Sequence, residues 1–118
     1  MEKYIAHEQI GYYCKDTEVW VNKRLSRMPY AQAGVISDGR GVSLISYSTL
    51  VCTISPDGWL TCTGTYSATT RKHIGAFMHE YGNGASYYTA KRCYEAGEAY
   101  NVFTGEILTL EEYARRAA

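Results

Sequence analysis

The sequence predicts an α+β fold, in which an antiparallel sheet of about three to five strands, built on β-hairpins, carries two or three helices on one face. Residues 42–66 are rich in β-branched and aromatic side chains and are interrupted by a Pro-Asp-Gly turn. Apolar residues at helical spacing follow this stretch. The length of 118 residues is typical of one domain, so we expect residues 1–118 to fold as a single unit.

The Pro-Asp-Gly turn is the most informative local signal. Pro56 presets φ at the first corner, and Gly58 accommodates the left-handed conformation of a three-residue hairpin loop. With this turn, the register predicts five facing pairs, which are Ile54–Leu60, Thr53–Thr61, Cys52–Cys62, Val51–Thr63 and Thr49–Thr65.

Alternation along the two arms of the hairpin separates two faces when residues 42–54 are taken as one strand. The predicted core face contains Leu44, Leu50, Cys52, Ile54, Leu60 and Cys62. The second face contains Thr49, Thr53, Thr61, Thr63 and Thr65, with Tyr47, Val51 and Trp59. We expect this threonine-rich face to be exposed to solvent or to meet a partner.

The four cysteines are Cys14, Cys52, Cys62 and Cys93, and no two of them have C-x-x-C spacing. This pattern argues against a zinc site, and we expect no cofactor. Cys52 and Cys62 face each other in the predicted register, so a disulfide is conceivable. In a reducing cytoplasm we expect two packed thiols instead.

Two helices are predicted after the hairpin. The first is capped by Ser67 or Thr69 and ends at Gly82 in a left-handed conformation. Its apolar stripe contains Ile74, Phe77, Met78 and Tyr81. The opposite face, which we expect to be exposed to solvent, contains Lys72, Ala76 and His79. The second is capped by Ser86, covers residues 87–98 and has a narrow stripe of Tyr87, Ala90, Tyr94 and Gly97, with Cys93 beside it.

A second, shorter hairpin is predicted over residues 99–108, with its turn at Thr104 and Gly105. Thr109 and Glu112 then have the spacing of a capping box, which predicts one or two terminal helical turns.

The first 41 residues are less informative. Val21, Leu25 and Met28 have helical spacing within residues 16–28, whereas residues 18–22 also suit a strand. We favour the helix. Residues 37–41 read as a turn that leads into the long strand.

Charge and hydropathy limit the possible partners. The formal net charge is zero, which does not favour nucleic acid, although it does not exclude it. No apolar run approaches the length of a membrane-spanning helix, so we expect no membrane partner. The first residues lack the apolar segment of a secretory signal, and we expect a cytoplasmic location.

One cluster of residues predicts a binding site. Thr69, Thr70, Arg71, Lys72 and His73 open the first helix, where free backbone N–H groups and the helix dipole favour an anion. Together with Tyr66 they form the surface we select. The alternative is a capped helix start with solvated basic side chains.

No catalytic arrangement is evident. His73 and His79 lie six residues apart, on different sides of the predicted helix, so they do not share a metal. No nucleophile, base and acid occur in a recognisable pattern, and we expect a protein that is not an enzyme. The excess of tyrosine, 12 against two Phe and two Trp, suits either a contact surface or the rim of a thin core.

One sequence pattern resembles a known group of proteins. It is made up of residues 46–51, 64–70, 72–74 and 100–106. Its distinctive part is Tyr66-Ser-x-Thr-Thr-x-Lys-His-Ile74. This pattern resembles small uncharacterised proteins of bacterial phages and mobile elements. The resemblance implies no activity and no site residues. It implies a setting in which small proteins bind host machinery, as anti-CRISPR proteins do.

The leading hypothesis is therefore a non-enzymatic binding protein of a phage or mobile element that contacts a host or element-encoded protein complex, as an inhibitor of host defence does. A second hypothesis is a nucleic-acid-binding accessory protein that adds Lys91 and Arg92 to the basic helix start and stacks bases on Tyr87 or Tyr88. A third is a small enzyme that uses a cysteine or His73. A homo-oligomer formed through the threonine-rich face is compatible with all three.

Overall fold

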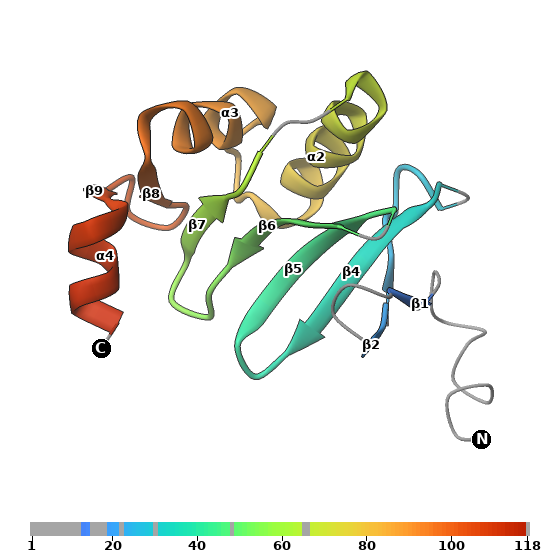
Figure 1. Ribbon diagram of the computed structural model, residues 1–118, viewed down its shortest axis with the longest axis horizontal. Coiled ribbons are helices and arrows are strands. Elements are labelled where there is room, and N and C mark those ends of the chain that lie inside the picture. The colour runs from blue at the N-terminus through green and yellow to red at the C-terminus, as the bar shows by residue number, and fades with distance from the viewer. Residues whose placement is uncertain are drawn as a thin grey trace.

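The computed structural model describes residues 13–14, 19–21, 23–29, 31–47, 49–64 and 67–117. These residues form three helices, a seven-stranded antiparallel sheet and a separate two-stranded pair, which confirms the α+β class (Figure 1). The elements are β1 (Tyr13–Cys14), β2 (Val19–Trp20), β3 (Lys23–Arg24), β4 (Ala33–Asp38), β5 (Gly41–Ser46), β6 (Thr49–Ile54), β7 (Trp59–Cys62), α2 (Ala68–Tyr81), α3 (Tyr87–Ala96), β8 (Glu98–Asn101), β9 (Ile107–Thr109) and α4 (Leu110–Ala117).

The strands of the large sheet follow one another in chain order from β3 to β9. Seven strands exceed the three to five that we predicted, partly because residues 42–54 form two strands rather than one. The chain reverses after β5, where Ser46 pairs with Thr49 across the turn. Tyr47 has a φ of 57° in this turn, and tight hairpin turns require such left-handed residues. Since Tyr is not a typical residue for that conformation, the reversal had no clear signature in the sequence.

The β6–β7 hairpin has the predicted register, with Cys52 opposite Cys62 and Ile54 opposite Leu60. The assignment of Leu50 and Val51 to faces was wrong. The pairing of β5 with β6 shifts between Leu44 and Ile45, which inserts one extra residue into β6. As a result Val51 lies in the main core and Leu50 packs with a second cluster around Ile45 on the other face.

Helices α2 and α3 lie together over one face of the sheet (Figure 1). Phe77, Ile74 and Met78 of α2 are fully buried there against Leu44 and Leu60 of the sheet. From α3, only Ala90 and Cys93 are buried, and Tyr94, which we placed in the apolar stripe, is 48% exposed. Helix α3 ends at Ala96, because Gly97 takes a left-handed conformation and Glu98 already belongs to β8.

Helix α4 does not share that face. Leu60 points into the main core, whereas its neighbour Trp59 points to the opposite side and contacts Tyr113 of α4, with ring centroids 5.7 Å apart. Two helices, α2 and α3, therefore pack on one face, within the two or three that we predicted, whereas α4 packs on the other. Trp59 is covered rather than exposed. Among the three helices that the structure describes, none is long and apolar enough to cross a membrane.

Most predicted helix caps are present. Ser67 caps α2, Ser86 caps α3 in a reciprocal pair with Thr89, and Thr109 and Glu112 bond each other's backbone N–H groups at the start of α4. Gly82 differs from the prediction, since its φ is −79°. A glycine is required there for space instead, because a Cβ would lie 2.5 Å from the carbonyl oxygen of Met78.

The helix that we favoured over residues 16–28 is wrong in the part that the structure describes. Val19–Trp20 and Lys23–Arg24 are short strands, and the chain then turns between Leu25 and Met28. Leu25 is fully buried against the main core. The side chain of Leu25 thus anchors a turn next to α2, and this turn shapes the candidate site.

Candidate functional site

The predicted surface at the start of α2 is divided by the fold. Thr70 and His73 are buried, with 5% and 1% of their surface exposed, and they point toward the sheet. Thr69, Arg71 and Lys72 remain exposed on the outer side of the helix. Tyr66 lies outside the described residues. The described side chains among these residues therefore do not form a single anion-binding site.

The buried pair belongs to a polar cluster between α2 and the end of β5. The hydroxyl oxygen of Ser46 lies 2.8 Å from Nδ1 of His73 and 3.1 Å from Oγ1 of Thr70. The hydroxyl of Ser67 donates to Oγ1 of Thr70 at 3.2 Å. Burial lowers the pKa of His73, which favours the neutral imidazole. The ring of Tyr47 lies against that of His73, with centroids 5.7 Å apart.

This cluster serves packing rather than ligand binding. Ser46 is only 2% exposed and His73 only 1%, so a substrate has no access to either group. Its hydrogen bonds satisfy polar side chains that would otherwise be costly to bury. The pair thus joins the turn after β5 to helix α2.

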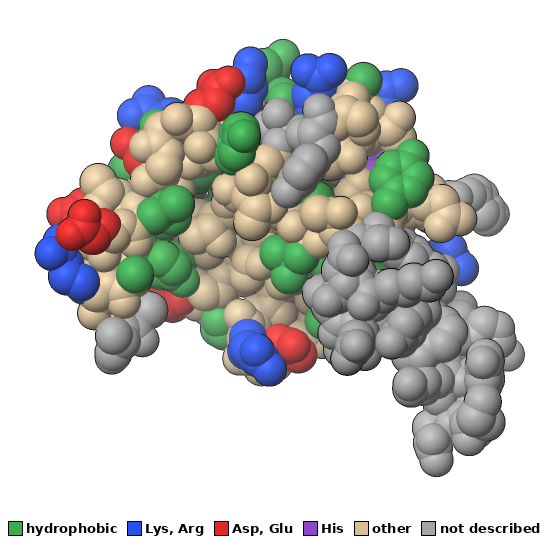
Figure 2. Space-filling model, viewed as in Figure 1, with side chains coloured by type: hydrophobic (Ala, Val, Ile, Leu, Met, Phe, Trp, Pro, Cys, Tyr) green, Lys and Arg blue, Asp and Glu red, His purple; other side chains and the backbone are tan. Residues whose placement is uncertain are grey.

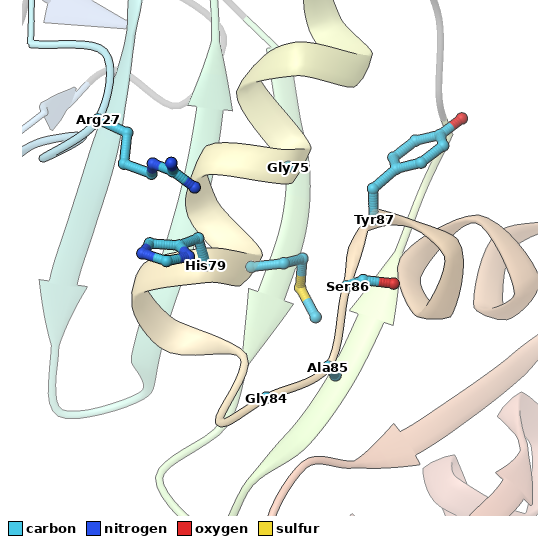
Figure 3. Close-up of a pocket in the computed structure, with 8 residues that line it drawn as sticks. Arg27, Gly75, His79, Gly84, Ala85, Ser86 and Tyr87 are labelled. Atoms are coloured by element: carbon cyan, nitrogen blue, oxygen red, sulfur yellow. The ribbon is translucent and has the colours of Figure 1, made fainter.

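A hollow of about 370 Å³ lies on the outer side of α2, where the helix meets the turn of residues 25–28 and the start of α3 (Figure 3). Arg27 extends toward α2 and lines this hollow together with His79. The lining residues are Arg27, Gly75, Met78, His79, Gly84, Ala85, Ser86 and Tyr87.

A second hollow, of about 310 Å³, continues along α2 and shares Arg27 and Gly75 with the first. Its lining residues are Arg27, Met28, Lys72, Gly75 and Ala76. We call the two hollows together the α2 groove. Ala76, which we expected on the solvent-exposed face of the helix, has only 7% of its surface exposed.

Gly75 forms the floor of the groove. Lys72, Gly75 and His79 follow one another along the same side of α2, at i, i+3 and i+7. A Cβ at Gly75 would meet no atom within 4 Å, so the missing side chain leaves open space rather than avoiding a clash. Glycine in a helix interior costs about 1 kcal/mol relative to alanine. Gly75 is thus unfavourable for the stability of the helix but makes the groove deeper at its middle.

Arg27 is held opposite Gly75 by its neighbours. The backbone N–H of Ser26 donates to a carboxylate oxygen of Glu80 at 2.9 Å, which ties the turn to α2. The guanidinium of Arg24 donates to the carbonyl oxygen of Pro29 at 2.9 Å and closes the same turn. With Leu25 buried beneath it, the turn presents Arg27 at a fixed place.

The groove is positively charged. Its two cations are Arg27 and Lys72, the imidazole of His79 adds a polar ring, and no acidic residue lines it. None of the ion pairs among the described residues uses these three side chains. Strand β3, the turn after it and the helices α2 and α3 together carry seven cations against two acidic residues, Glu80 and Glu95. The cations are Lys23, Arg24, Arg27, Arg71, Lys72, Lys91 and Arg92. Figure 2 shows Lys and Arg side chains along the upper edge, above α2 and α3.

Sequence reasoning found Lys72 but missed Arg27, Gly75 and the use of His79. Arg27 was hidden because residues 16–28 were read as a helix, which gave no reason to place this side chain beside α2. The one available signal was Gly75, a helix-weakening residue within an otherwise regular stripe.

Among the described residues, no group of three or more His, Cys, Asp or Glu side chains is placed to hold a metal ion. Cys52, Cys62 and Cys93 are free, buried thiols, as expected. Cys14 lies where side chains are not described.

Residues 13–95 match a family described as "Family of unknown function (DUF8033)". The match covers well over half of the chain, so the protein belongs to this family. It extends from β1 to the penultimate residue of α3 and therefore includes every residue that lines the α2 groove. Neither the curated proteins nor the solved structures contain a match to the chain.

Proposed function

We propose that this member of the DUF8033 family is a non-enzymatic binding protein that holds an acidic segment of a partner protein in the α2 groove. One observation carries the proposal. Arg27, Lys72 and His79 converge on a continuous groove without an acidic side chain in its lining. Complementary charge of this kind directs association and selects the partner.

The shape of the groove favours an extended peptide segment over a compact small molecule. Two hollows of about 370 and 310 Å³ share Arg27 and Gly75 at their junction, so they form a trough rather than one enclosed cavity. Met28 and Met78 add apolar contact surface to the cations. The matching ligand is a segment with one or two carboxylates next to an apolar side chain.

The setting of the proposal comes from the resemblance to proteins of phages and mobile elements. In that setting the partner is a host or element-encoded protein complex, and occupation of its acidic segment inhibits a host defence system as anti-CRISPR proteins do. The closed surroundings of Ser46 and His73 support a non-enzymatic role. We propose a cytoplasmic location on the same grounds.

Charge reversal at matched positions tests the function. The partner is captured from nuclease-treated bacterial lysate on immobilised protein and quantified by mass spectrometry. Arg27→Glu and Lys72→Glu should each reduce the captured complex at least tenfold. Arg71→Glu changes the net charge equally but lies outside the groove lining, so it should reduce capture less than about twofold. Equal losses in all three variants would refute binding in the groove.

A second candidate function is nucleic-acid binding, which the basic helical layer favours. Tyr88 and Tyr94 of α3 are 74% and 48% exposed, and Lys91 and Arg92 lie on the same helix. Aromatic rings for base stacking beside cations for phosphates are typical of proteins that bind single strands. This candidate predicts nucleic acid on the column when nuclease is omitted, its release by modest salt, and its loss in Tyr88→Ala and Lys91→Glu.

A further inference from the structure

We propose that Cys52 and Cys62 form a redox-sensitive modification site, at which a hydroperoxide converts two neighbouring thiols into a disulfide across the β6–β7 hairpin. The site lies in the hairpin of β6 and β7 and is independent of the α2 groove. Its evidence is the register of the hairpin and the contact between the two sulfur atoms.

The hairpin places the two cysteines at the required separation. Cys52 and Cys62 are directly opposite in the antiparallel pairing. Thr63 N–H donates to the Val51 carbonyl and Ser55 N–H to the Trp59 carbonyl, so the cysteine pair occupies a position without backbone hydrogen bonds between its own members. Facing Cα atoms at such positions are about 4.5 Å apart. This value lies at the short end of the window for disulfides, about 4.4–6.8 Å.

The side chains already meet on the same face. The Cys52 thiol hydrogen-bonds to the sulfur of Cys62, and the thiol of Cys62 donates to the carbonyl oxygen of Gly64 at 3.4 Å. The bond from Cys52 lowers the pKa of Cys62 and raises that of Cys52. Cys62 is 7% exposed and Cys52 is fully buried. Cys62 is thus the sulfur that a small oxidant meets first and the better thiolate of the two.

Cys93 is the nearest competitor. It approaches the pair from α3 and is 2% exposed. Burial raises the pKa of its thiol to about 11, so it stays protonated near neutral pH. It also comes from a separate element, without the fixed strand register that holds Cys52 opposite Cys62. The bridge should therefore be specific to the cross-strand pair.

The chemistry balances with a hydroperoxide as the oxidant. The Cys62 thiolate attacks the outer peroxide oxygen, an S–O bond forms, the O–O bond breaks, and the leaving hydroxide or alkoxide takes up a proton. Cys52 then gives up its proton and attacks the sulfur of the sulfenic acid, the S–O bond breaks, and water leaves. Two thiols lose two electrons and two protons in total, and the peroxide is reduced to water and an alcohol, or to two waters.

The experiment uses the full chain, oxidised with hydrogen peroxide, unfolded in an alkylating reagent and mapped by peptide mass spectrometry. We expect two of the four thiols to be lost, one cross-linked peptide pair joining Cys52 to Cys62, and reversal by dithiothreitol. Cys93→Ser should leave this result unchanged, whereas Cys62→Ser should abolish the bridge.

Four retained thiols, a bridge that includes Cys93 or Cys14, or irreversible oxidation of Cys62 without a bridge would each overturn the proposal. The map of the unsubstituted protein identifies the joined sulfurs directly. The result therefore stands even if a cysteine variant does not fold.

Discussion

The Nδ1 atom of His73 and the hydroxyl oxygen of Ser46 lie 2.8 Å apart in the protein interior. Ser46 is the last residue of β5, and His73 is in the second turn of α2. Their contact fixes the first half of the helix over the turn at Tyr47. It also places an ionisable group where a charge is unfavourable, and this makes the stability of the fold depend on pH.

The first prediction concerns that pH dependence. Burial holds the pKa of His73 below its usual 6.5, so the unfolded chain takes up a proton at a higher pH than the folded protein does. The contribution of His73 to stability is complete above the unfolded pKa and is lost as the pH falls through the lower, folded pKa. Urea unfolding between about pH 7.5 and 5 should therefore show a falling free energy of unfolding.

Two glutamine variants isolate this effect from the titration of carboxylates. His73→Gln should cost about 1–2 kcal/mol near neutral pH and should flatten the pH dependence relative to the unsubstituted protein. His79→Gln removes an exposed imidazole and should retain the full dependence. Parallel pH profiles for the unsubstituted protein and His73→Gln would show that His73 is not the responsible group.

The second prediction concerns Asn101, which joins two hairpin turns. Its side-chain N–H donates to the Asp57 carbonyl at 3.1 Å, and its side-chain oxygen accepts from the N–H groups of Phe103 and Thr104. Since Asn101 is only 5% exposed, Asn101→Ala should destabilise the protein by about 2–4 kcal/mol in chemical unfolding. Asn83 is exposed and has a left-handed φ of 51°, which glycine adopts without strain, so Asn83→Gly removes one bond and should cost about 1 kcal/mol or less. Equal costs would contradict this account.

The third prediction compares two glycines of the α2 region. Gly75→Ala adds a Cβ into open space and removes a helix-weakening residue, so it should stabilise the protein by about 0.5–1 kcal/mol. Gly82→Ala brings a Cβ within 2.5 Å of the Met78 carbonyl oxygen and should be destabilising. Thermal unfolding measures both changes. A destabilised Gly75→Ala would mean that the groove floor is not open.

The parts of the fold that the sequence predicted are those governed by local chemistry. The Pro56–Gly58 turn determined the register of β6 and β7, and Ser67, Ser86 and Thr109 marked three helix starts. The face of Val51 was not predictable in the same way. A bulge depends on the pairing of β6 with β5, which the β6–β7 turn does not reveal.

The candidate site was predicted only in part, for a related reason. Helical spacing shows which residues share a face but not how the helix is rotated over the sheet, so Thr70 and His73 were placed outside although they are buried. Arg27 reaches the groove from a turn 45 residues before Lys72 in the chain. Contacts over such separations depend on the tertiary fold, and the single sequence contained no local pattern that indicated this one.

The most direct measurement of the central claim fills the groove without changing its charge. The leucine side chain of Gly75→Leu should fill the floor of the groove opposite Arg27, and leucine is a good helix former, so the helix should be retained. Affinity for the captured partner complex, measured by biolayer interferometry, should fall at least about tenfold, a loss of about 1.4 kcal/mol, in Gly75→Leu and stay unchanged in Gly75→Ala. Full affinity in a folded Gly75→Leu variant would contradict binding in the α2 groove.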